Sequence, residues 1–113
     1  MINTKELRLG NLFANIEDDS IYKVTKINED TIEGICINKM GWFGEQHFHL
    51  IEQVLPIKLT EEWLLKCGGI KWLLSDHEYY YVLINNKKIR IKFVHSLQNI
   101  YLCIEQKELN LCL

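Results

Sequence analysis

The residues with the clearest chemical potential are cations that recur along one predicted strand near residue 90. They fall at every second position, with one more in the preceding turn: Lys87, Lys88, Arg90 and Lys92. Tyr79, Tyr80 and Tyr81 are close enough in sequence to supply stacking surfaces. Cations beside aromatic rings suit ligands that contain phosphates and bases. A solvated strand face has the same composition, and lysine on an edge strand also discourages aggregation.

Two histidines lie two positions apart on another predicted strand. This spacing would place the imidazoles of His47 and His49 on one face, as a metal site requires, with another histidine as a third ligand. Phe48 and Leu50 alternate with them, and we expect these apolar side chains to face the core. The imidazoles would then lie in water without an obvious acidic or thiolate ligand, so we predict no metal and no cofactor.

His95 lies where a strand pattern changes into a helix pattern. A histidine there could act as an acid or base, or donate to an anion at the helix N-terminus, so we include it among the candidate ligand-binding residues. The alternative, which we favour, is that its ring bonds a backbone group and fixes the turn. No Ser, Cys or acid is marked as a partner nucleophile, and neither a phosphate loop nor a dinucleotide fingerprint occurs. We therefore predict no catalytic residues.

Two large aromatic residues, Trp42 and Phe43, stand between Gly41 and Gly44 in a predicted loop. Exposed aromatic residues of this kind are common anchors in protein interfaces. The equally supported alternative is that both rings fold back and close one end of a barrel.

The first half of the chain consists of short strand patterns about ten residues apart. They cover residues 12–16, 21–27, 31–37 and 46–51. This spacing predicts a meander that curls into a small, partly open barrel. Gly10 and Gly34 suit a tight turn and a bulge or bend.

The second half reads as a helix, an antiparallel sheet and a final helix. Thr60 is a good N-cap for a helix over residues 61–67, with Leu59 and Leu64 as a hydrophobic staple. Strand patterns cover residues 70–74, 79–84 and 88–93, and asparagines between the last two suit a tight hairpin turn. Leu109, Leu111 and Leu113 alternate, which is compatible with a last edge strand.

The final helix has its apolar stripe from Leu97 onward. It also carries Leu102 and Cys103, so it is apolar nearly all round. A chain of this length has little material to cover both sides of such a helix, and we therefore predict a homo-oligomer.

Composition predicts a soluble globular protein, and the strand and helix patterns predict an α+β fold. The 113 residues divide into a small β-barrel-like subdomain over 1–56 and a second subdomain over 57–113. The net charge of −2 is not that of a strongly basic nucleic-acid binder. No apolar run approaches the ~20 residues of a membrane span, and we find no signal peptide. We expect a cytoplasmic protein with free thiols and no membrane partner.

Three motifs resemble a family of short, uncharacterised proteins from gut-type anaerobic bacteria and their prophages. They are L-R-L-G-N at residues 7–11, P-I-K-L-T-E-E-W-L-L-K-C-G at 56–68, and V-H-S-L-Q-N-I-Y at 94–101. The resemblance implies a mobile-element origin but no reaction, cofactor or active site. Family members often have glycine after the last helix, where this chain has Gln106.

These observations favour a non-enzymatic binding protein of phage or mobile-element origin. It would engage a host protein or sequester a small anionic, nucleotide-like ligand, with counter-defence as one such role. The expected ligand-binding residues are Trp42, Phe43, Tyr79, Tyr81, Lys88, Arg90, Lys92 and His95. The alternative is a nucleic-acid-binding accessory protein that uses the basic strand, and a small hydrolase is a distant third.

Overall fold

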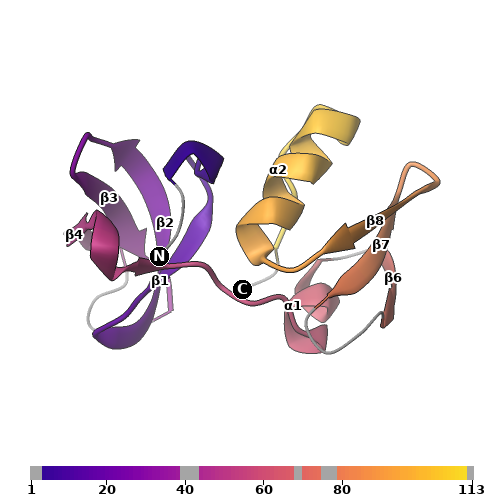
Figure 1. Ribbon diagram of the computed structural model, residues 1–113, viewed down its shortest axis with the longest axis horizontal. Coiled ribbons are helices and arrows are strands. Elements are labelled where there is room, and N and C mark those ends of the chain that lie inside the picture. The colour runs from indigo at the N-terminus through magenta and orange to yellow at the C-terminus, as the bar shows by residue number, and fades with distance from the viewer. Residues whose placement is uncertain (1–3, 39–43, 68–69, 75–78, 112–113) are drawn as a thin grey trace. The chain divides into compact units, whose positions relative to one another are not determined.

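The predicted α+β fold is confirmed by a computed structural model of the chain, which describes residues 4–38, 44–67, 70–74 and 79–111 (Figure 1). The chain forms two compact units, Met1–Ile57 (unit 1) and Lys58–Leu113 (unit 2).

Unit 1 is a curled antiparallel sheet of five strands, which confirms the predicted barrel-like meander as a half-barrel. The strand order is β4-β3-β2-β1-β5. The strands are β1 (Leu12–Asn15), β2 (Asp18–Ile27), β3 (Thr31–Cys36), β4 (Gln46–Leu50) and β5 (Val54–Leu55). Two short 3-10 helices, η1 (Thr4–Glu6) and η2 (Ile51–Gln53), precede β1 and β5.

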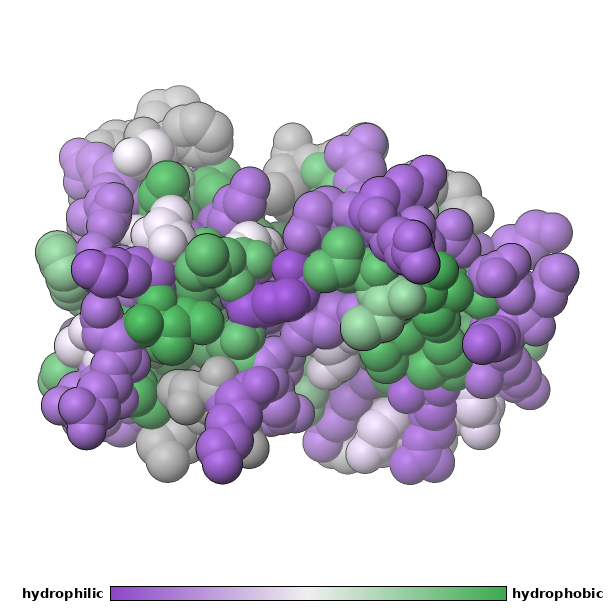
Figure 2. All heavy atoms as spheres, turned by 90° about the horizontal axis from the view of Figure 1, so that it is seen from above, coloured by the Kyte–Doolittle hydropathy of each residue, from purple (hydrophilic) through white to green (hydrophobic). Residues whose placement is uncertain are grey.

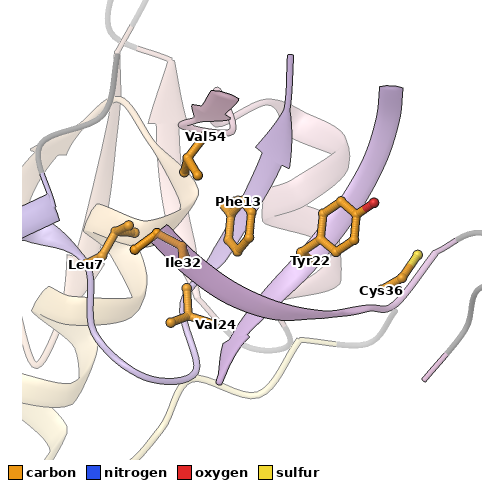
Figure 3. Packing of buried hydrophobic residues seen from close by; sticks show 7 residues of the cluster. All are labelled: Leu7, Phe13, Tyr22, Val24, Ile32, Cys36 and Val54. Carbon is orange, nitrogen blue, oxygen red and sulfur yellow. The ribbon is translucent and has the colours of Figure 1, made fainter. Parts of the chain in front are cut away.

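The core of unit 1 forms where β1, β2 and β3 turn the same face inward. Its buried members are Leu7, Phe13, Tyr22, Val24, Ile32, Cys36 and Val54 (Figure 3). The rings of Phe13 and Tyr22 stack with their centroids 5.5 Å apart. Gly34 lies against them, since a Cβ at this position would come within 3.0 Å of the Phe13 ring. The absence of a side chain at Gly34 is what lets the Phe13 ring lie on β3.

The two glycines singled out in the sequence differ in role. Gly10 takes a φ of +90°, in a turn where the Asn11 amide donates to the Arg8 carbonyl over 3.0 Å. This positive φ suits glycine and explains the residue. The register of β2 and β3 shifts between Val24 and Lys26, opposite Gly34, so the extra residue lies on β2.

The expected orientation of β4 is wrong. Phe48 is 71% exposed, whereas His49 is only 4% exposed, so the histidines and not the apolar residues point inward. Residues directly opposite each other in an antiparallel pair share a face. His49 is opposite Ile32 and His47 is opposite Gly34, and both partners belong to the buried face of β3. Pairing with β3 therefore decides the orientation.

Unit 2 contains a three-stranded antiparallel sheet and two helices. The sheet order is β6-β7-β8, with β6 (Lys71–Leu74), β7 (Tyr80–Ile84) and β8 (Lys87–Ile91). The helices are α1 (Glu61–Lys66) and α2 (Val94–Glu105), and α2 lies against β7. Val82, Ile84 and Ile91 are the most deeply buried residues of this sheet.

The local signals in unit 2 act as the sequence predicts. The Thr60 hydroxyl accepts from the Trp63 amide over 3.4 Å, and both staple residues, Leu59 and Leu64, are buried. Asn85 and Asn86 take positive φ values of 50° and 64°, as a two-residue hairpin turn requires. Of the predicted last strand, the described residues form a single bridge between Cys67 and Leu111, and Leu113 lies outside the described residues.

Helix α2 begins at Val94, three residues before the start of its apolar stripe at Leu97. The extended residue Phe93 is its N-cap. The helix ends at Glu105, and the C-cap Gln106 takes the left-handed conformation with φ 58° that glycine usually occupies. Cys103 on its later turns is exposed. In Figure 2, hydrophobic residues form a continuous patch in unit 2 bordered by hydrophilic ones.

Candidate ligand-binding face

The sheet of unit 2 turns one row of residues from each strand away from its buried face. Along β7, Val82 and Ile84 are buried, so Tyr81 and Leu83 project from the opposite face. Their cross-strand partners share that face. Continuing the alternation one residue beyond β7 and β8 completes what we call the basic face: Lys71, Leu73, Tyr79, Tyr81, Leu83, Lys88, Arg90 and Lys92.

The basic face is a grid set by the strand register. One row across the sheet contains Leu73, Tyr81 and Arg90, because Tyr81 pairs with both neighbours. The next row contains Lys71, Leu83 and Lys88. The β8 side of the grid is therefore cationic, and its middle is aromatic and aliphatic.

Each of the three cations of the basic face at Lys88, Arg90 and Lys92 lies near a tyrosine ring. The Lys88 ammonium lies 4.5 Å from the centroid of the Tyr81 ring, and the Arg90 guanidinium carbon lies 4.0 Å from that of Tyr79. The Lys92 ammonium lies 5.7 Å from the same Tyr79 ring. Such cation–π contacts contribute roughly 0.5–1 kcal/mol each at exposed sites. They hold the long side chains over the sheet, which lowers the entropy cost of binding an anion.

The backbone beneath these side chains is also fixed. The Lys92 carbonyl accepts from the Leu59 amide over 2.8 Å, just beyond the end of β8. At the other end, the turn of Asn85 and Asn86 sets the register of Lys87 opposite Ile84. Backbone hydrogen bonding and strand pairing therefore fix the register of the row of cations at both ends.

The charge of the chain is distributed unevenly between its units. Residues 58–113 contain eight Lys and Arg against six Asp and Glu, a net charge of +2. Residues 1–57 contain five against nine, a net charge of −4. The overall charge of −2 is therefore the sum of an acidic unit 1 and a basic unit 2. Over the positions described for the basic face, four residues are Lys or Arg and none is Asp or Glu.

The structure brings together five of the eight residues named from the sequence, namely Tyr79, Tyr81, Lys88, Arg90 and Lys92. Trp42 and Phe43 lie outside the described residues.

His95 lies apart from the basic face: it is 1% exposed, on the first turn of α2, with its ring stacked on Phe93 at 5.7 Å. We leave it out of the site. Tyr80 alternates to the opposite face from Tyr81, where its ring meets that of Trp72 at 5.8 Å.

Three members of the face were not named from the sequence: Lys71, Leu73 and Leu83. Leu73 is 54% exposed and Leu83 is 37% exposed. Alternation within residues 70–74 and 79–84 could have identified these three residues as members of the outer face. Val82 and Ile84 belong to the buried face of β7, so residues at the intervening positions point outward. Apolar residues on the outer face of a strand are easily taken for core when only their type is considered.

A second polar cluster lies inside unit 1. The Asn15 amide nitrogen is 2.6 Å from Nδ1 of His49, and its oxygen accepts from the Glu17 amide over 2.8 Å. Because that acceptor role fixes the amide orientation, the nitrogen donates and His49 Nδ1 accepts. The ring also contacts Tyr22, with centroids 4.2 Å apart. This arrangement is that of a neutral histidine packed in a core.

Within the described part of the chain, no group of three or more His, Cys, Asp or Glu residues is placed to hold a metal ion. The described cysteines, Cys36, Cys67 and Cys103, are not joined in disulfides. Among the helices described, none is long and apolar enough to cross a membrane. No protein-family model, curated protein or solved structure matches this chain.

Proposed function

We propose that the protein is a non-enzymatic binding protein whose basic face holds the phosphate backbone of a nucleic acid. The observation that carries this proposal is the row of Lys88, Arg90 and Lys92 along β8, with each cation beside a tyrosine ring. Phosphate contacts supply most of the affinity of proteins that bind nucleic acid without sequence preference.

The spacing of the row suits a linear polyanion. Side chains on one face of a strand recur every ~6.7 Å, twice the rise per residue. A stacked nucleic-acid strand advances ~3.4 Å per phosphate. The row of Lys88, Arg90 and Lys92 could therefore meet several phosphates of a strand lying along β8. A compact anion would engage only one or two of these cations, so this geometry favours a nucleic acid over the small nucleotide-like ligand that the sequence suggests.

The test measures binding of a fluorescently labelled oligonucleotide by anisotropy at several salt concentrations. Contact with three phosphates of a single strand gives a slope of log K against log salt near about −2. Raising the salt fourfold should then weaken binding by about 20-fold.

The triple variant Lys88→Gln, Arg90→Gln and Lys92→Gln should lose most of the affinity and its salt dependence. A matched control removes three exposed cations elsewhere: Lys23, Lys26 and Lys107. This control should bind as the unmodified protein does. No binding at low salt, or equal losses in both triple variants, would overturn the proposal.

A further inference from the structure

We infer that the basic face selects single-stranded nucleic acid, with phosphates along β8 and bases over Leu73, Tyr81 and Leu83. This inference rests on the proposed function and adds the class of ligand and its orientation on the sheet.

The first observation is the apolar surface next to the cations. Leu73 is 54% exposed and lies directly opposite Tyr81, whereas Leu83 is 37% exposed and lies opposite Lys88. Leu73 and Leu83 are diagonal neighbours on adjacent strands, a distance that side chains of this size can bridge. Together with the Tyr81 ring, which has the Lys88 ammonium over one face, they form one apolar strip beside the row of cations.

The second observation is the order of the columns across the sheet. Three cations lie along β8 and its end, the aromatic and aliphatic residues lie on β7, and β6 contributes Lys71 and Leu73, of which Leu73 continues the apolar strip. Two strand spacings separate β8 from β6, or roughly 9–10 Å. A nucleotide whose phosphate lies on β8 therefore has its sugar and base directed over the strip.

The chemistry of the strip distinguishes single strands from duplexes. A duplex has its phosphates on the outside and the faces of its bases stacked inside. Its phosphates can contact the cations of the basic face, but its bases cannot lie on the leucines. The bases of a single strand are free to lie on apolar and aromatic side chains, and this contact tolerates any sequence. The Arg90 guanidinium on Tyr79 adds a second platform, because bases also stack on guanidinium planes.

The experiment compares three probes at one salt concentration: a single-stranded thymidine 15-mer, a duplex of the same length, and inorganic polyphosphate of similar charge. We expect the single strand to bind at least about tenfold more tightly than either of the others. The double variant Leu73→Ser and Leu83→Ser should lose about tenfold or more toward the single strand and keep its affinity for polyphosphate. Loss of one base–aromatic stack typically has an effect of this size, and we expect the loss of both leucine contacts to be comparable.

The matched control is Leu65→Ser on α1, which changes a leucine that is 76% exposed and lies outside the basic face. It should bind all three probes normally, and circular dichroism should show that every variant is folded. Equal affinity for the single strand and polyphosphate, or tighter binding of the duplex, would overturn the base-contact inference while the proposed function stands. Failure to bind any of the three probes would overturn the proposed function itself.

Discussion

The packing of unit 1 gives a prediction whose sign can be worked out in advance, the effect of Gly34→Ala. Gly34 has no positive φ, so an alanine there meets no backbone strain. In a strand interior alanine is favoured over glycine by roughly 0.5–1 kcal/mol. Without a steric obstacle the substitution should therefore stabilise the protein.

The obstacle is the ring of Phe13. The added Cβ would lie 3.0 Å from two atoms of this ring and 3.1 Å from Cβ of Tyr22. Phe13 is fully buried and is held by Tyr22 on one side and His49 on another, with centroids 5.5 and 5.2 Å away. Overpacking of this kind costs about 1–3 kcal/mol. The net effect should be a loss of about 1–2 kcal/mol, which corresponds to a fall in Tm of about 5–10 °C.

Urea unfolding followed by circular dichroism measures this loss as a shift in midpoint. A double-mutant cycle with Phe13→Leu identifies its cause, because leucine lacks the ring atoms that the new methyl group meets. The two substitutions should be less damaging together than the sum of their separate effects, by about 1 kcal/mol. A stabilised Gly34→Ala protein, or strictly additive effects, would show that the Phe13 ring does not require this glycine.

Three further predictions concern other parts of the chain. Asn15→Ala should lower the free energy of unfolding in urea by about 1–3 kcal/mol, because it removes the buried hydrogen bond to His49; an unchanged midpoint would contradict this. Thr60→Ala should cost about 1 kcal/mol by the same measurement through loss of the α1 N-cap, and Thr60→Ser should restore most of it. Light scattering at micromolar concentration should show more than one copy per particle, and Leu102→Glu should dissociate or precipitate the protein; a monomeric unmodified protein would count against the oligomer.

Local chemistry made much of the fold predictable. Thr60 predicts a helix start because its hydroxyl can accept a hydrogen bond from a backbone amide, and the structure contains that bond. Asn85 and Asn86 predict a hairpin turn because asparagine tolerates a positive φ, and both residues adopt one. Each of these outcomes depends on residues within a few positions of one another. Gln106 was not predictable in this way, because it takes the left-handed conformation after α2 although a residue other than glycine is disfavoured there.

The orientation of β4 depends on residues far apart in the sequence. Alternation of histidines with Phe48 and Leu50 is the same pattern whichever set faces inward. The choice is made by pairing with β3, about fifteen positions earlier, where the inward Gly34 leaves room for the Phe13 ring. Similarly, β5 is only two residues long, which is too short for an alternating pattern to predict a strand there. The alternation of residue types within one β-strand therefore cannot show which face points inward when pairing with a neighbouring strand decides it.

The candidate site shows the same limit and suggests how a solvated strand differs from a binding surface. Alternating cations on β8 alone fit either description, and an exposed leucine is ordinary by itself. The strand register brings Leu73 and Leu83 beside Tyr81, and both lie within one or two strands of the cations. A surface that needed only solubility would gain nothing from apolar residues at these positions. Their juxtaposition with a row of cations matches a ligand that has a charged edge and a flat apolar edge, and a single nucleic-acid strand has both.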